Sequence, residues 1–303
     1  MNGMRSEESI DEDIHEVLGP RAGDPGGADG LPYQLGLSAR VGARWSDFIQ
    51  LPPNRDLPSW VADDAGIDAS VARAFDRAHH LAAAWGVVAD RIDDGQVRRP
   101  DRFAEVRGRL LDAWRAALGD ACGGALAVEL VDQSLDAWRE GTAIERSLLG
   151  RPGRAEAPGD YFRAVRLRLR WVSTSAVAML RSVGDLDRAS RLERAYATFL
   201  CGLQCRDDFV DADDDRAIRG ASTHEALGVP RGALLRVAPR ALCMAAEACR
   251  QAAFDRLAAW IAGFAREVDV RSRDGSAAQD GLAGFVLTAA LEEISREDFA
   301  HAG

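Results

Sequence analysis

The chain has 303 residues, of which 47% are hydrophobic, and it carries a formal net charge of −10 with a pI near 5.1. This length allows one large domain or two ordinary ones, and the hydrophobic content is enough for a sizeable core. The acidic balance argues against a nucleic-acid partner, because such a partner requires a clustered basic face.

The basic residues are all arginines, since the sequence contains no lysine. Schiff-base lysine chemistry and the lysine of a phosphate-binding P-loop are therefore excluded. Any anionic ligand has to be held by arginine, by helix N-termini or by a metal ion. The 5 cysteines are odd in number and form no CxxC motif, which favours a reducing, cytoplasmic location over a disulfide framework. No secretory signal peptide and no transmembrane helix are expected, because no long apolar run occurs.

The predicted elements are helical along almost the whole chain. Residues 1–32 are acidic and then rich in glycine and proline, which predicts a disordered tail. From about residue 67 onward, apolar residues recur at helical spacing, and no alternating strand pattern occurs. The sequence therefore predicts an all-α domain over residues 33–303, with Asp68 as a helix N-cap. The expected helices cover about 68–94, 101–118, 122–148, 159–182, 185–214, 231–271 (with a break near Pro239) and 276–298.

One predicted helix, residues 185–214, ends in a cluster of aspartates. Asp207 and Asp211 lie four positions apart and Asp208 lies beside them, so all three point from the same end of the helix. These carboxylates repel one another, and the C-terminal end of the helix dipole disfavours them further. A bound Mg²⁺ would remove this penalty, because hard cations prefer carboxylate oxygens. A solvated helix end is the plain alternative. Residues 213–215 are expected to lie in the loop beyond, with at most one of these aspartates joining the metal site.

A second acidic end closes the first long predicted helix. Asp90, Asp93 and Asp94 share one face at spacings of three and four, and Arg98 and Arg99 follow. Two such ends, far apart in sequence, could face each other across a cavity in a helix bundle. The second end shifts the interpretation of both clusters toward metal binding.

The segment from Gly202 to Asp211, GLQCRDDFVD, resembles the second aspartate-rich motif of the trans-polyprenyl diphosphate synthases. That motif has a glycine, an apolar residue with glutamine, two spacers and DDxxD. The segment from Asp90 to Arg99, DRIDDGQVRR, resembles the first motif of the family, DDxxD followed by four residues and two arginines. The order of the two motifs and their spacing also match. The resemblance covers about residues 65–225 and implies the class I isoprenoid synthase fold, a helical bundle around a central cavity.

In that superfamily the two acidic helices hold Mg²⁺ ions, usually three, and these ions bind an allylic diphosphate and ionise it to a carbocation. Diphosphate leaves readily only when metals and arginines neutralise its growing charge. The carbocation then needs a dry and apolar cavity. The resemblance implies an allylic prenyl diphosphate of C10–C20 as substrate, Mg²⁺ or Mn²⁺ as cofactor, and a homodimer.

The resemblance also assigns roles to individual residues. The catalytic residues it implies are Asp90, Asp93, Asp207 and Asp208. The metal ligands it implies are Asp90, Asp93, Asp94, Asp207, Asp208 and Asp211. The diphosphate-binding residues it implies are Arg98, Arg99, Arg168, Arg170, Gln204 and Arg219, with Arg168 and Arg170 as alternatives for a lysine of the family.

The sequence departs from the family in its first motif and its acceptor site. If Asp93 is the last aspartate of the first motif, Ala89 replaces the first one, and DRIDD then also resembles the DxxED form of squalene and phytoene synthases. The site for isopentenyl diphosphate is weakened, because Ala82 stands where a histidine is expected. His79 and His80 lie nearby, and a partly buried polar role is expected for them rather than metal binding.

The third departure concerns terpene synthases. Asparagine occurs only at Asn2 and Asn54, so the Asn/Ser/Glu metal triad of ordinary bacterial terpene synthases is absent. The sequence therefore favours an enzyme on the polyprenyl-synthase pattern that ionises its substrate and then cyclises or rearranges it. One alternative is a prenyltransferase that couples the allylic group to isopentenyl diphosphate or another acceptor. A further alternative, motivated by Ala89, is a catalytically silent subunit that regulates a true synthase.

Overall fold

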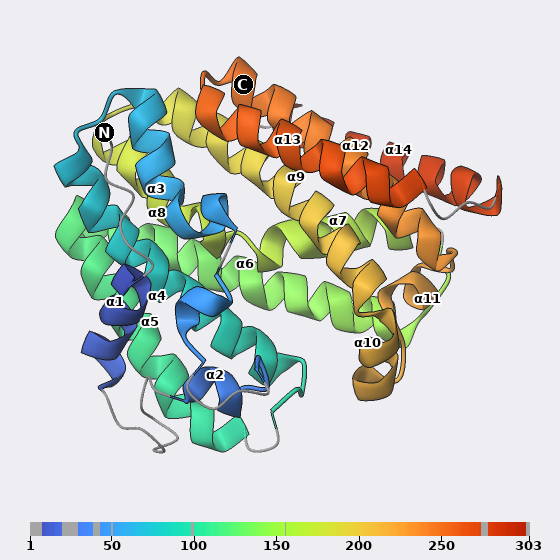
Figure 1. Ribbon diagram of the computed structural model, residues 1–303, viewed down its shortest axis with the longest axis horizontal. Helices are drawn as coiled ribbons and strands as arrows, with labels where there is room; N and C mark the ends of the chain where they lie inside the picture. The colour runs from blue at the N-terminus through green and yellow to red at the C-terminus, as the bar shows by residue number, and fades with distance from the viewer. Residues whose placement is uncertain are drawn as a thin grey trace. The chain divides into compact units, whose positions relative to one another are not determined.

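The structure is a computed structural model that describes residues 8–19, 30–38, 43–49, 51–97, 100–154, 156–273 and 278–300. Within these ranges the chain is all-helical and has no strand, which confirms the predicted all-α class (Figure 1). The helices are α1 (Glu8–Leu18), α2 (Leu31–Gln34), the 3-10 helix η1 (Trp45–Asp47), α3 (Pro52–Ala65), α4 (Ala69–Asp93), α5 (Pro100–Cys122), α6 (Gly124–Gly150), α7 (Ala157–Arg168), α8 (Trp171–Ser182), α9 (Leu186–Val210), α10 (Ala212–Arg219), α11 (Thr223–Leu227), α12 (Arg231–Gln251), α13 (Asp255–Arg273) and α14 (Ala278–Ala300).

The chain divides into two compact units. Unit 1 consists of Met1–Val131 and Thr174–Gly184, and unit 2 consists of Asp132–Ser173 and Asp185–Gly303. The chain passes from one unit to the other three times: within α6, within α8, and between Gly184 and Asp185 just before α9. None of the helices in the described part of the chain is long and apolar enough to cross a membrane.

Unit 1 is organised around α4, which packs against α1, α3 and α5. The Asp68 side chain accepts a hydrogen bond from the backbone N–H of Ser70 at 2.7 Å, which confirms the predicted N-cap. Residues 8–18 were expected to belong to a disordered tail but form helix α1. The reason is that Ile10, Ile14 and Leu18 recur at helical spacing and are all buried, so even this short acidic segment has an apolar face to bury.

In unit 2, α12 packs along both α9 and α13 (Figure 1). Gly202 allows the close approach of α9 and α12, because a Cβ atom there would lie 2.9 Å from Leu242 Cγ. The helix predicted for residues 231–271 does break, but not near Pro239, which stays inside α12. The break falls after Gln251, where Ala253 takes a left-handed φ of 56°. Arg188 donates hydrogen bonds to the carbonyls of residues 252 and 253 and so satisfies this helix end.

Two other predicted helices are also divided. The helix predicted for residues 159–182 is interrupted at Leu169 and Arg170, between α7 and α8. No proline or glycine marks this break in the sequence. The helix predicted for residues 185–214 ends at Val210, and α10 follows at once. Both breaks change the directions in which the side chains of the candidate site point.

Candidate functional site

The acidic end of α9 places two of the predicted aspartates in very different surroundings. Asp208 is only 5% exposed, whereas 53% of the Asp207 side chain is exposed and lies 3.0 Å from Arg206. Asp211 is the C-cap of α9 and is also exposed. The helix therefore turns one carboxylate of the motif into the protein and leaves two at the surface.

Asp208 is held by hydrogen bonds at both of its oxygens. Gln204 Nε2 donates to Oδ1 at 2.7 Å, and the hydroxyl of Tyr161 on α7 donates to Oδ2 at 2.7 Å. Burial raises the pKa of the Asp208 carboxyl to about 6, although these two hydrogen bonds lower it. Burial also raises the pKa of Tyr161 well above its ordinary value, so Tyr161 stays protonated and remains a donor.

The pKa of Asp207 is raised to about 6 as well, first by desolvation and then by Asp208 and Asp211. Because half of its side chain is exposed, water screens this carboxylate more strongly than that of Asp208. The charge of Asp208 is therefore the more strongly constrained of the two.

The predicted arginines Arg168 and Arg219 meet on a common acid, Glu145 of α6. Arg219 donates to Glu145 at 3.0 Å and to Asp215 at 2.6 Å, while Arg168 forms an ion pair with Glu145. The Arg168 guanidinium also lies over the ring of Trp138, 5.3 Å from its centroid. The two arginines thus share one carboxylate, and their role in binding diphosphate stays a prediction.

Residues 213–215 were expected to lie in a loop, but they form the first turn of α10. Carboxylates are favoured at a helix N-terminus, where the dipole is positive. Asp215 is 5% exposed and pairs with Arg219. Together with buried Asp208 and half-buried Glu145, it gives this cluster three carboxylates against two guanidinium groups among the described residues.

The acidic end of α4 lies in unit 1. Asp90, Asp93 and Asp94 are all half-buried there, and Asp93 lies 3.7 Å from Arg107 of α5. Asp94 caps the helix, and its backbone N–H donates to the carbonyl of Asp90. Ala89, at the position of the missing aspartate, is 1% exposed and packs in the core. The structure therefore keeps these three aspartates together, and their convergence with the α9 end on one ligand stays a prediction.

Arg170 makes contacts other than those of Arg168 and Arg219. Arg170, which lies beyond the end of α7, pairs with Glu193 at 2.7 Å and donates to Gln133 at 3.2 Å. Arg98 and Arg99 lie outside the described residues. Arg168 and Arg170 were expected to be alternatives for one role. Because α7 ends at Arg168, the two side chains contact different residues, Glu145 and Glu193.

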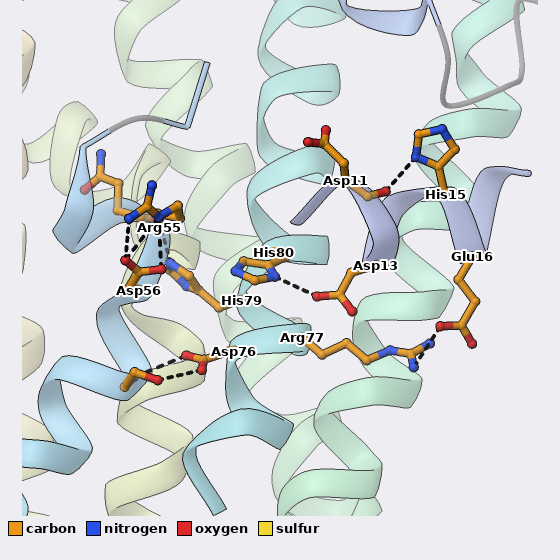
Figure 2. Close-up of polar contacts among 12 residues, drawn as sticks. Asp11, Asp13, His15, Glu16, Arg55, Asp56, Asp76, Arg77, His79 and His80 are labelled. Atoms are coloured by element: carbon orange, nitrogen blue, oxygen red, sulfur yellow. Dashed lines mark hydrogen bonds and ion pairs between the residues drawn. The ribbon is translucent and has the colours of Figure 1, made fainter. Parts of the chain in front are cut away.

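His79 and His80 are both buried in unit 1, which agrees with the polar role expected for them (Figure 2). His80 Nδ1 lies 2.6 Å from the carboxylate of Asp13 on α1, and His79 Nε2 lies 2.6 Å from the carbonyl of Asn54. Burial lowers the pKa of His79 to about 4. This pair ties α1 and α3 to α4.

The donor set of the α9 end suits a hard cation in chemistry but is not assembled as a cage. Among the described residues, no three His, Cys, Asp or Glu side chains are placed so that they could hold one metal ion. Mg²⁺ is commonly bound by one or two carboxylates together with substrate phosphates and water. In that kind of site the substrate brings the other ligands, so one or two of the carboxylates of Asp207, Asp208 and Asp211 would be enough, and their role as metal ligands stays a prediction.

Sequence reasoning missed two residues of this site, Tyr161 and Glu145, and it expected a third, Asp215, in a loop. The partners of Tyr161 and Glu145 lie on other helices, so no local spacing could reveal them. Asp215 alone had a signal, because it stands four positions before Arg219, the spacing of a helical ion pair.

The chain was compared with protein-family models, with curated proteins and with solved structures, and it matches none of them.

Proposed function

We propose that the protein is a divalent-metal-dependent enzyme that releases diphosphate from an allylic prenyl diphosphate and cyclises or rearranges the resulting carbocation. Buried Asp208 carries this proposal. Its carboxylate belongs to a cluster with more acids than bases, and burial raises its pKa to about 6. A helix end with only a structural role would be more stable without that charge, whereas a site for a cation requires it. The class I isoprenoid synthase fold is part of the same proposal.

In this proposal one or two of the carboxylates of Asp207, Asp208 and Asp211 would hold the metal, and Mg²⁺ would supply the positive charge that makes diphosphate a better leaving group. Gln204 and Tyr161 orient the Asp208 carboxylate through the hydrogen bonds described above. Arg168 and Arg219 stabilise the negative charge that grows on the leaving diphosphate, for which guanidinium groups are well suited. To do so, they exchange part of their contact with Glu145 for contact with the diphosphate.

Cyclisation or rearrangement is preferred over transfer to isopentenyl diphosphate. Ala82 stands where the resemblance places an acceptor-binding histidine, and it is completely buried. A prenyltransferase remains the second candidate, because both reactions begin with the same ionisation. The proposal extends to a homodimer, which light scattering on the purified chain tests.

The experiment measures diphosphate release from C10, C15 and C20 allylic diphosphates with Mg²⁺, with Mn²⁺ and with EDTA. We expect release that depends on the metal, and products that do not change when isopentenyl diphosphate is added. A product formed only with isopentenyl diphosphate would establish transfer instead. Release from none of the three substrates would refute the proposal and leave the silent regulatory subunit.

The matched variant is Asp208→Asn, which keeps the shape of the side chain and removes its charge. We expect diphosphate release to fall about a hundredfold or more, because even second-layer ligands to a metal are worth tenfold to a hundredfold. The control is Asp214→Asn, an exposed aspartate in the first turn of α10, which should leave the rate within about twofold.

A further inference from the structure

A cavity of about 320 Å³ lies in unit 2, apart from the aspartate cluster. It is lined by the second half of α7, the link that follows it, the first turn of α8 and the middle of α9. Pockets that bind small molecules begin at about 300 Å³. None of its lining residues belongs to the cluster of Tyr161, Glu145 and Asp208.

The lining of this cavity is strongly basic, although the chain as a whole carries a net charge of −10. Among the described residues, Arg166, Arg170 and Arg194 line it together with one acid, Glu193. Glu193 forms an ion pair with Arg170 at 2.7 Å. The described lining therefore has more guanidinium groups than carboxylates, which favours an anionic ligand.

The arginines reach the cavity from two sides. Arg166 comes from α7, where it donates to the backbone carbonyl of Ile294 at 3.2 Å. Arg194 comes from α9, where it donates to Ser190 Oγ at 2.5 Å. These hydrogen bonds help to hold the two guanidinium groups in place. Ser190 also lines the cavity, and its hydroxyl can donate to a ligand, since the bond to Arg194 uses its oxygen as an acceptor.

Part of the lining is apolar. Leu200 and Ala197 line the cavity from α9, and Leu200 is only 3% exposed. A cavity lined by both arginines and apolar side chains suits a ligand that has an anionic group and a short apolar part.

We infer that this cavity is a second anion site, which binds a small molecule carrying a phosphate or diphosphate group. Planar guanidinium groups bind phosphate oxygens in a bidentate manner, and a protein without lysine depends on arginine for this task. The site is independent of the aspartates and of the reaction proposed above, because it needs no metal.

The test is calorimetric titration of the full chain in EDTA with inorganic phosphate, inorganic diphosphate and dimethylallyl diphosphate. EDTA withholds the metal, so binding reports on the cavity even if the proposed enzymatic activity is wrong. We expect one saturable site per chain for at least one of the two diphosphates, with an affinity that falls as salt is added.

The decisive variant is Arg166→Gln combined with Arg194→Gln, which should weaken binding at least tenfold, because two charge-assisted contacts are lost. The matched controls are Arg163→Gln on α7 and Arg191→Gln on α9. They remove the same charges from the same helices, but Arg163 pairs with Glu140 and Arg191 pairs with Asp187, both outside the cavity. These controls should retain the affinity of the parent chain within about threefold.

A third variant, Ala197→Leu, fills the cavity without changing any charge and should also weaken binding. Circular dichroism shows whether the double variant folds. If it does not fold, Ala197→Leu still tests the inference. Tighter binding of dimethylallyl diphosphate than of inorganic diphosphate would assign the apolar side chains of the lining to a ligand tail, and equal binding would assign the site to the inorganic ion. No binding of any of the three anions, or equal weakening in the controls, would overturn the inference.

Discussion

Asp208 is the residue at which stability and the proposed function oppose each other. Its pKa is raised from 3.8 to about 6, first by burial. Below pH 3.8 the folded and unfolded chains both carry the proton. As the pH rises from 3.8 to 6, only the folded chain keeps it, and above pH 6 the folded chain has to hold the buried charge. At neutral pH this charge therefore costs about 3 kcal/mol of folding free energy.

Asp208→Asn should accordingly raise the free energy of unfolding at pH 7.5 by up to about 3 kcal/mol, and by less at pH 4.5. Urea denaturation at the two pH values measures this. Asp207→Asn is the control and should change stability little, because its side chain is 53% exposed. If Asp208→Asn is less stable at pH 7.5, the carboxylate has a structural role and the argument from its charge fails.

Tyr161 is a positioning residue in the proposed reaction, because it acts through Asp208. Its hydrogen bond lowers the pKa of Asp208, so Tyr161→Phe should raise that pKa further above 6. The acid limb of the pH–rate profile should then move to higher pH, and the apparent metal affinity should fall by about tenfold. Tyr196→Phe, which changes another buried tyrosine that packs against Phe199, should shift neither. Lower activity with an unshifted pH profile would show that Tyr161 only supports packing.

His79 should make unit 1 sensitive to acid. Its pKa is lowered from 6.5 to about 4 by burial. Between these two pH values His79 is therefore protonated in the unfolded chain and neutral in the folded chain. The stability contributed by the neutral ring is lost as the pH falls from 6.5 to 4, and the loss reaches about 3 kcal/mol. His79→Gln keeps a donor for the Asn54 carbonyl and should lose less free energy of unfolding between pH 6.5 and 4.5. His15→Gln should behave as the parent chain does, and equal losses in the parent and in His79→Gln would contradict this origin.

At the scale of helices, Gly202 sets the distance between α9 and α12. A Cβ atom there would lie 2.9 Å from Leu242 Cγ and 3.2 Å from the Ala238 carbonyl oxygen. Gly202→Ala should lower the free energy of unfolding by about 1–3 kcal/mol, since buried Leu242 has little room to move. The control is Gly263→Ala in α13, where the nearest atom would be 3.7 Å away. Thermal unfolding should show that substitution to be stabilising, because alanine favours helix, and a similar gain for Gly202→Ala would disprove the close contact.

The helices themselves were predicted well where their signals are local. Residues 68–94 have an N-cap, a continuous apolar face and a glycine after the last turn, and α4 covers nearly the same range. The break between α7 and α8 had no such signal, because leucine and arginine are both good helix formers. At Gly141 of α6, a Cβ atom would lie 2.8 Å from the Ala164 carbonyl. This close contact between α6 and α7 is a tertiary feature that the pattern of either helix alone does not contain.

At the scale of the molecule, ligand binding should appear as stability, because a ligand that binds only the folded chain raises its melting temperature. Inorganic diphosphate alone should raise the melting temperature through the arginine-lined cavity. Adding Mg²⁺ should raise it further through Asp207 and Asp208, and EDTA should remove only this second increment. Asp208→Asn should lack the second increment while keeping the first. An Mg²⁺ increment of the same size in Asp208→Asn would place the metal elsewhere.

The sequence by itself determined the helical class, the N-cap at Asp68 and the two acidic helix ends, because each depends on residues within about four positions of one another. It also determined that anions are held by arginine, since there is no lysine. Only the tertiary structure decided that Asp208 is buried while Asp207 is exposed, that Tyr161 binds Asp208 across 47 positions, and that Arg219 meets Glu145 across 74. Burial and charge pairing arise from packing between helices, which the local pattern of a single helix does not specify.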